Sequence, residues 1–176
     1  MIGEIGYIFL IFAFTLSFLQ FFNSVKISFF NFSEENFKFL KSLTYFISFF
    51  LLFSFFSLII SYVISDFSIL NIYNNSHTNK PLLYKISGTW GNHEGSLLMW
   101  LAMLGLYGLL FTKFTTQESN IFTSRALFAI SVINIGFIGF TIFTSNPFER
   151  ITPIPLEGNG LNPVLQDPGL AFHPPL

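Results

Sequence analysis

The C-terminal tail contains the residues whose types and spacing most favour chemistry. From Phe143 to Leu176 the chain is rich in Pro, Gly and Asn, and it ends in His173-Pro174-Pro175. Because proline fixes φ and lacks a backbone donor, we expect a rigid, non-helical surface segment here. A neutral imidazole on such a segment is a good metal ligand. On the residues alone, His173 is either such a ligand or a hydrogen-bonded structural histidine.

A second polar stretch, Gly88 to Trp100, leads directly into an apolar run. It contains the pair His93-Glu94, which invites comparison with zinc proteases. That motif needs a second histidine four residues after the first, and this position is Leu97. The comparison with zinc proteases therefore fails.

The same stretch also has a structural interpretation. The glycines at 91 and 95 allow close backbone approach, and Glu94 is placed near the positive end of a helix dipole. Trp90 and Trp100 are expected as aromatic anchors at the membrane–water interface. The residues alone favour this interpretation over a catalytic one.

Other kinds of chemistry have little support in this chain. It has no Cys, which excludes thiol catalysis, disulfides and thiolate metal sites within it. No serine lies in a nucleophile elbow, and the only aspartates are Asp66 and Asp167. His77 lies in a polar run and is assigned no role. The net charge is −1 and basic residues are sparse, so nucleic acid is not an expected partner.

Composition indicates a membrane protein. Hydrophobic residues make up 52% of the chain and charged residues only 10%, against about a quarter in a soluble domain. The 27 Phe residues, with many Ile, Asn, Ser and Lys, indicate codon bias from an A+T-rich genome. We interpret this as a mitochondrial inner-membrane protein, with an A+T-rich bacterium and its inner membrane as the alternative.

Four apolar stretches approach or exceed the roughly 20 residues that a membrane-spanning helix needs. None contains a charged side chain. They run from Ile5 to Phe22, from Ser42 to Ser65, from Gly95 to Thr112 and from Ala126 to Phe143. The sequence therefore predicts an all-α, polytopic membrane protein, and we expect the Phe-rich second span to face lipid.

The distribution of basic residues predicts the topology. The first and third loops contain five Lys and Arg residues and the other side only three, which favours the first and third loops as cytoplasmic or matrix-facing. Both termini are then on the outer face. We expect a four-helix transmembrane region over residues 1–143 with an external loop at 66–94. Residues 144–176 form a Pro/Gly-rich external loop ending in the H-P-P motif.

Several short motifs, in order from about Ser65 onwards, resemble one known family. The motifs are Asp66-Phe67, Asn75-Ser76-His77-Thr78, Trp90-Gly91-Asn92-His93-Glu94-Gly95-Ser96-Leu97, Thr144-Ser145-Asn146-Pro147-Phe148, Leu161-Asn162-Pro163, Gln166-Asp167-Pro168-Gly169-Leu170 and His173-Pro174-Pro175. Together they resemble the N-terminal part of the cytochrome c maturation haem lyase of the CcmF type. The first two spans match only as hydrophobic helices.

The resemblance implies a protein that receives haem from a haem chaperone. It would join the haem to the two thiols of a C-x-x-C-H motif in apocytochrome c on the outer face of the inner membrane. By the resemblance, His173 is an axial ligand to the iron of this substrate haem. Trp90, His93, Glu94 and Asp167 are then expected near the site, without an assigned catalytic role.

The chain also departs from the family pattern. It lacks the W-G-x-x-W-x-W-D motif, and no span contains a histidine. A split gene explains this, so we expect an N-terminal subunit that shares haem with partner chains, the remaining lyase fragments, and is not active alone. The alternative is a non-catalytic structural membrane subunit derived from that lyase, within a larger inner-membrane or respiratory assembly.

Overall fold

The computed structural model describes residues 1–30, 32–115, 120–163 and 166–172, and in these ranges the regular elements are helices. One isolated β-bridge joins Ile69 and Arg150. The helices are α1 (Ile2–Val25), a π-helical turn (Lys26–Phe30), α2 (Glu34–Val63), α3 (Leu70–Asn75), α4 (Leu82–Gly88), α5 (His93–Phe114), α6 (Asn120–Phe143) and α7 (Pro168–Phe172). The predicted all-α class is confirmed.

Four helices, α1, α2, α5 and α6, are long and apolar enough to cross a membrane. They contain the four predicted spans, apart from the last two residues of the second, and most extend beyond the apolar runs into polar flanks. A helix satisfies its backbone groups internally, so it need not end where the hydrophobic residues end. The sequence located the spans but underestimated the length of these helices.

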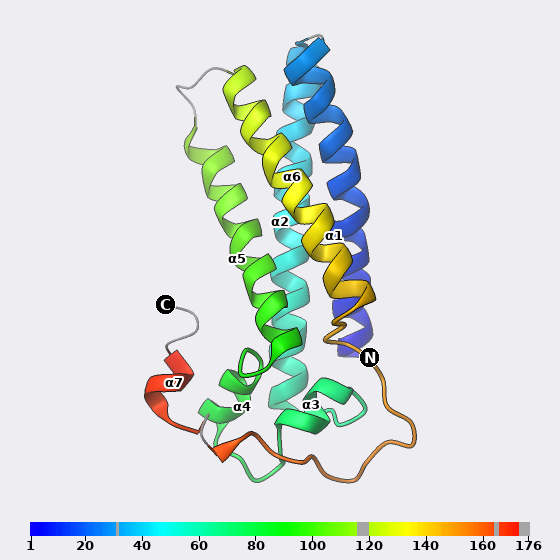
Figure 1. The fold of residues 1–176 in the computed structure, drawn as a ribbon, viewed down its shortest axis with the longest axis vertical. Coiled ribbons are helices and arrows are strands. Elements are labelled where there is room, and N and C mark those ends of the chain that lie inside the picture. Colours follow the sequence, from blue (N-terminus) through cyan, green and yellow to red (C-terminus); the bar gives the residue numbers. More distant parts are fainter. Residues whose placement is uncertain (31, 116–119, 164–165, 173–176) are drawn as a thin grey trace.

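The four long helices pack side by side, as Figure 1 shows, with α2 between α1 and α5 and with α6 against α1. Small residues bring the backbones together at these contacts. The Ser54 hydroxyl donates to the Gly6 carbonyl at 2.8 Å, and the Ser48 hydroxyl donates to the Gly105 carbonyl at 2.7 Å. Such contacts replace the hydrophobic driving force that is missing between helices in lipid.

The Phe-rich helix α2 has one exposed face, as expected for a helix that faces lipid, and one buried face. Four of its five serines and several leucines are buried against α1 and α5. Its exposed aromatic residues lie on the other face and include Phe46, Phe49, Phe53 and Phe56. Because codon bias places phenylalanine widely along the helix, both faces are hydrophobic, and the sequence does not show which face is buried.

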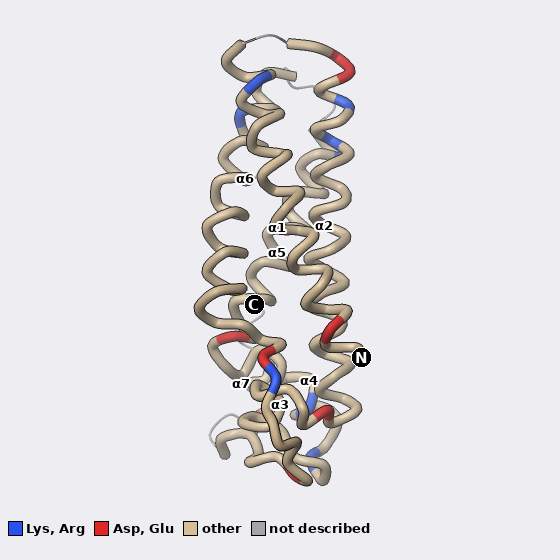
Figure 2. The backbone as a smooth tube through the Cα atoms, turned by 90° about the vertical axis from the view of Figure 1, so that its right-hand side faces the viewer, with Lys and Arg blue, Asp and Glu red and all other residues tan. Residues whose placement is uncertain are grey.

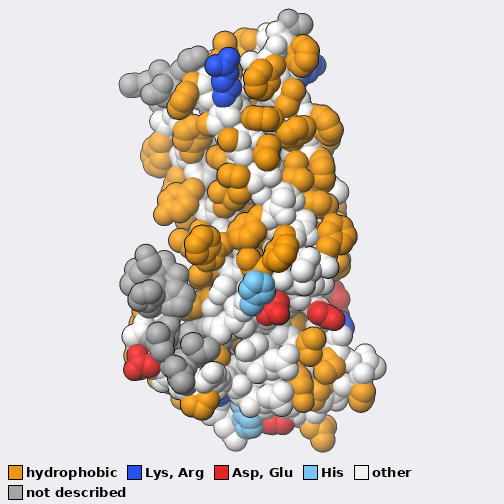
Figure 3. All heavy atoms as spheres, in the orientation of Figure 1, with side chains coloured by type: hydrophobic (Ala, Val, Ile, Leu, Met, Phe, Trp, Pro, Cys, Tyr) orange, Lys and Arg blue, Asp and Glu red, His pale blue; other side chains and the backbone are white. Residues whose placement is uncertain are grey.

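Charged residues lie at the two ends of the bundle, with a band free of charge between them (Figure 2). The hydrophobic side chains that cover this band are seen in Figure 3. The N-terminus, the segment with α3 and α4, and the described part of the tail share one end, here called the loop end (Figure 1). This confirms that these three parts lie together, as the charge distribution predicted.

The segments at the loop end contain more helix than the sequence indicated. The predicted loop at 66–94 contains α3 and α4, and the start of α5 lies at its end. The tail, expected to be non-helical, forms the short helix α7 from Pro168 to Phe172. Proline is tolerated at the first position of a helix, so the run of prolines did not exclude a helix here.

Candidate functional site at the loop end

In the turn between α4 and α5, backbone segments approach one another closely. Asn92 caps α5 by accepting the Gly95 backbone N–H at 2.8 Å. The Ser96 hydroxyl donates to the Trp90 carbonyl at 2.7 Å. A Cβ built on Gly95 would lie 1.6 Å from the Thr89 carbonyl oxygen, so only glycine fits. The close backbone approach expected from the glycines is confirmed, and Glu94 lies in the first turn of α5.

A polar network joins this turn to the end of α2 and to α3. The Tyr62 side chain is fully buried, and its hydroxyl donates to Asn71 Oδ1 at 2.5 Å. Asn92 Nδ2 donates to the Tyr62 hydroxyl at 3.0 Å. Asn71 Nδ2 donates to Asn92 Oδ1 at 2.7 Å and to Glu94 Oε2 at 3.2 Å. Glu94 is therefore part of a structural network that fixes three elements to one another.

Sequence reasoning missed most of this network. Tyr62, Asn71 and Asn92 belong to three separate segments, and Tyr62 and Asn71 lie outside the motifs named above. The one available signal was Asn92, which precedes an apolar run at the position where N-cap residues are favoured. Beside the network lies a polar pocket with about 270 Å³ of empty volume, lined by Leu70, Asn71, Asn74, Asn75, Glu94, Asn146 and Glu149.

The tail is fixed to the loop end by backbone hydrogen bonds. The Leu70 N–H donates to the Glu149 carbonyl at 2.8 Å, and the Ile151 N–H donates to the Ser68 carbonyl at 3.0 Å. Further along, the Gly160 N–H donates to the Ser76 carbonyl at 3.0 Å. These bonds hold the tail as a strap across the residues that follow α2.

Charged and polar side chains reinforce the strap. Arg150 contacts Glu4 and Ser68 and lies 3.6 Å from the Asp66 carboxylate, so it joins the tail to α1 and to the end of α2. Further along, Lys80 Nζ and Gln166 Nε2 both donate to the Leu161 carbonyl, at 3.2 and 2.9 Å. Burial of Lys80 lowers the pKa of its ammonium group.

Trp90 holds the last described helix of the tail. Its indole Nε1 donates to the Ala171 carbonyl at 2.9 Å, and α7 also packs against α4. Asp167 begins α7, since its Oδ1 accepts the Gly169 N–H at 2.7 Å. Trp90 and Asp167 therefore both position α7, which ends at Phe172, directly before the sequence position of His173.

The predicted site residues that the structure describes contact different parts of the protein. His93 is exposed, and its ring lies 6.5 Å from that of Phe140 on α6, whereas Trp90 contacts the tail. His173, the predicted haem ligand, lies outside the described residues. In the described ranges no group of three His, Cys, Asp or Glu residues could hold a metal ion.

The place of Trp100 at the membrane–water interface stays a prediction. Trp100 lies seven residues after His93, the first residue of α5, and is therefore about 10 Å further along the helix axis. Its side chain is 61% exposed.

Acid should loosen the middle of the strap. The Glu157 carboxylate accepts the backbone N–H and hydroxyl of Thr78, both at 2.9 Å, and the Gly158 N–H at 3.1 Å. These bonds, the Thr78 N–H foremost, lower the pKa of Glu157 below its ordinary value of 4.5. The stabilisation is therefore present above pH 4.5 and is lost as pH falls through the lower pKa of the folded protein.

Hydrogen exchange of the Thr78 and Gly158 amides checks this expectation. As pH falls from 4.5 through the lower pKa of Glu157, both amides should lose protection in the native protein, whereas the Glu157→Gln variant should show no such titration, since it has no carboxylate to protonate. An identical pH response in the two proteins would contradict the role given to Glu157.

The chain is similar to known proteins of one family. The family model "Cytochrome C assembly protein" matches residues 90–176. The chain is 47% identical to cytochrome c-type biogenesis protein ccl1 of Rhodobacter capsulatus over 122 residues, 69% of this chain and 19% of that protein. It is 50% identical to CycK of Bradyrhizobium diazoefficiens over 123 residues, 70% of this chain and 19% of that protein.

Two further matches concern CcmF itself. The chain is 41% identical to CcmF of Escherichia coli K12 over 124 residues, 70% of this chain and 19% of that protein. A solved structure described as "Cytochrome c Heme Lyase CcmF" has the same fold, with a TM-score of 0.79 and 22% identity over 85% of this chain and 25% of that one. The chain thus spans about a fifth of the length of these curated relatives, and it belongs to the cytochrome c assembly family, among relatives of the CcmF and CycK type.

Proposed function

We propose that this chain takes part in cytochrome c maturation as the N-terminal subunit of a split haem lyase. It helps to hold haem while the haem vinyl groups are joined to the C-x-x-C-H thiols of apocytochrome c. The family relationship supports this function. The chain has no Cys, so the reacting thiols belong to the apocytochrome.

The observation that carries the proposal is the hydrogen bond from Trp90 Nε1 to the Ala171 carbonyl. It ties the tail to the turn before α5, which the Asn92 cap and the close packing of Gly95 make rigid. We propose that His173, which follows α7 by one residue, is an axial ligand to the iron of the substrate haem. A neutral imidazole is a common axial ligand of haem iron.

The chain would have a positioning task in this reaction. Binding energy used to fix the reacting groups lowers the entropic part of the barrier. The strap, α7 and the α4–α5 turn form a rigid base on which a ligand can be presented. Trp90, Glu94 and Asp167 are then positioning residues, because Trp90 and Asp167 hold α7 and Glu94 belongs to the network at the α4–α5 turn.

The rest of the lyase must come from further polypeptide, because the chain corresponds to about a fifth of the relatives' length. We propose that it is supplied by separate partner chains, with haem delivered by a haem chaperone. An immunoblot of native membranes tests this arrangement. A band near 20.1 kDa supports a separate subunit, and a much larger band contradicts it.

We propose an inner-membrane location with the loop end on the outer face. Five of the eight Lys and Arg residues lie toward the opposite end, which the positive-inside rule places in the cytoplasm or matrix. The Phe-rich composition favours a mitochondrion, whereas the relatives named above are bacterial. Immunodetection of the chain in purified mitochondria, or in a bacterial membrane fraction, decides between them.

The role in cytochrome c maturation is tested in cells whose only copy of the gene carries His173→Ala. We expect covalently haem-bearing cytochrome c to fall at least about tenfold, because losing a direct ligand should cost no less than losing a supporting one. Haem staining of membrane and soluble proteins measures the effect. His77→Ala is the matched control, since His77 lies at the same end and has no assigned role. Normal maturation in His173→Ala would favour the non-catalytic structural subunit.

A further inference from the structure

The outer face of α5 crosses the charge-free band of the bundle. On this helix the band extends from Glu94 to Lys113, 19 residues apart, or about 28 Å at 1.5 Å per residue. This length matches the roughly 30 Å of a bilayer's hydrocarbon core. The midpoint of the membrane on α5 therefore lies between residues 103 and 104.

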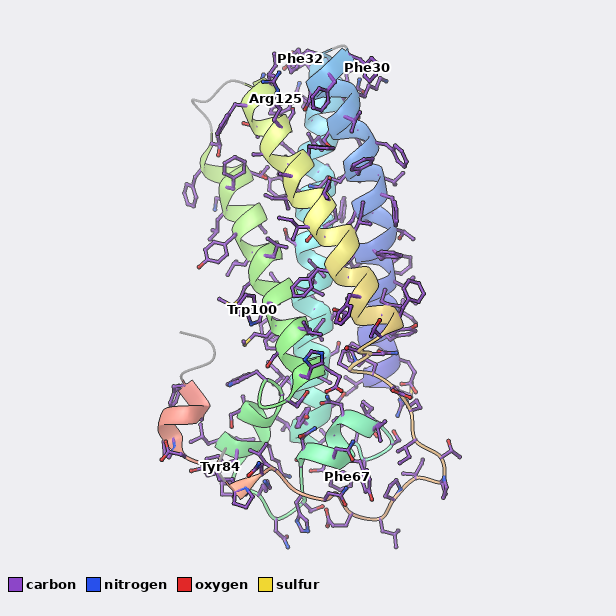
Figure 4. The ribbon with its side chains drawn as sticks, in the orientation of Figure 1. Phe30, Phe32, Phe67, Tyr84, Trp100 and Arg125 are labelled. Carbon is purple, nitrogen blue, oxygen red and sulfur yellow. The ribbon has the colours of Figure 1, made fainter. Side chains whose placement is uncertain are left out.

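Three aromatic side chains line this face at intervals of seven residues. Trp100 is 61% exposed, Tyr107 63% and Phe114 72%. Figure 4 shows Trp100 on the side of α5 that points away from the bundle. A seven-residue repeat places side chains along one seam of a helix, which is the pattern of a surface that receives another helix.

Two of these side chains are costly to expose to lipid. Trp100 and Tyr107 lie about 5 Å on either side of the membrane midpoint, although such residues are enriched at the interfaces. Side chains on a helix point toward its N-terminus, so Tyr107 is directed toward the membrane centre and away from the nearer interface. Among the residues that the structure describes, none accepts a hydrogen bond from the Trp100 indole or the Tyr107 hydroxyl.

The surface next to Tyr107 is hollowed. A groove with about 950 Å³ of empty volume is lined by Tyr107, Leu110, Phe111, Phe114, Thr115 and Phe122. Residues from both α5 and α6 line the groove. Helix α5 packs more closely against α2, and α6 against α1, than α5 and α6 pack against each other. A groove beside a row of exposed aromatic residues favours a protein occupant.

We propose that this α5 face, defined by Trp100, Tyr107 and Phe114, docks a transmembrane helix from the remaining part of the lyase. That helix carries a hydrogen-bond acceptor opposite Tyr107. The proposal rests on the function proposed above. About four-fifths of the relatives' length has no counterpart in this chain, so further polypeptide is available to cover the face.

The position of the tail supports this choice of occupant. The described tail ends in α7, which α4 and Trp90 hold near the foot of α5 (Figure 1). In a longer relative with the same fold, the polypeptide that follows the tail therefore begins on the α5 side of the bundle. A helix that begins there reaches the α5 face without crossing the other helices.

Photocrosslinking in native membranes tests the proposal. A benzophenone amino acid replaces Tyr107 in one variant and Phe114 in a second, and both sites are exposed aromatic positions. The matched control is the same replacement at Phe46, which is 55% exposed on α2. Adducts are identified by mass spectrometry, and cytochrome c maturation is measured in each strain.

We expect the probes at positions 107 and 114 to crosslink to a membrane segment of the lyase, and the probe at 46 to crosslink to lipid. Lipid adducts alone at 107 and 114, a crosslink to a second copy of this chain, or a crosslink to an unrelated protein would overturn the proposal. Failure of the proposed function would give a different result from failure of the docking proposal. If the proposed function is wrong, deleting the chain leaves cytochrome c maturation unchanged.

Discussion

Replacing Gly95 with alanine is expected to destabilise the loop end by about 3 kcal/mol, the upper part of the range for overpacking. The added Cβ would lie 1.6 Å from the Thr89 carbonyl oxygen and 3.2 Å from Asn92 Oδ1. The first contact involves backbone, which no side-chain rotation can relieve. The turn must therefore open, and the hydrogen bond from the Gly95 N–H to Asn92 is strained with it.

Thermal unfolding of the detergent-solubilised protein measures this effect. The midpoint should fall by on the order of 10 °C. Gly136→Ala is the matched control, because a Cβ at Gly136 meets nothing within 4 Å and alanine favours a helix interior. If the two variants unfold at the same temperature, the close approach of Gly95 to Thr89 does not exist in the protein.

The second large effect is expected for Asn92→Ala, also about 3 kcal/mol. Loss of an N-cap costs about 1 kcal/mol. The Asn92 side chain also donates to the buried Tyr62 hydroxyl and accepts from Asn71, and leaving such groups unpaired costs about 1–3 kcal/mol. The change therefore weakens the contacts between α2, α3 and α5 together.

Asn74→Ala is the control for this prediction. Asn74 is exposed and lines the same polar pocket, so its loss should change the unfolding midpoint little. Hydrogen exchange should show lost protection over α3 and the first turn of α5 in Asn92→Ala and unchanged protection in Asn74→Ala. Equal stability of the two variants would contradict the network as the element that joins these helices.

The four long helices were predictable because membrane physics imposes a strong pattern. A span must be long, apolar and internally hydrogen-bonded, and each predicted run lies within a helix of the structure, except for the two final residues of the second. The sequence did not show which faces of the helices pack together. On α2, for example, the exposed face is rich in Phe and the buried face contains serines, so hydrophobicity does not mark the buried side. In a chain this hydrophobic, polarity no longer separates inside from outside.

The loop end was only partly predictable. The glycines of the α4–α5 turn and the place of Glu94 followed from the sequence, because close approach and helix dipoles act locally. The helix α7 did not, since its Asp167 cap was hidden among prolines. The bond between Trp90 and Ala171 joins residues 81 apart, and no local rule predicts such a contact.

The assignment of haem ligation depended on the family resemblance and remains a prediction. Physical reasoning from the residues left His173 open between a ligand and a structural role. The structure supports a rigid base up to Phe172, through Trp90 and the strap, and the family relationship supplies the chemistry. The position of His173 itself lies outside the described residues.

The haem content of the purified complex tests the central claim most directly. The complex of this chain with its partners is isolated from cells expressing the native protein, His173→Ala or His77→Ala, and its absorption spectrum is recorded per mole of complex. We predict that His173→Ala loses the haem held at this site while His77→Ala retains it. Equal haem content and unchanged spectra in all three complexes would contradict the assignment of His173 as a haem ligand.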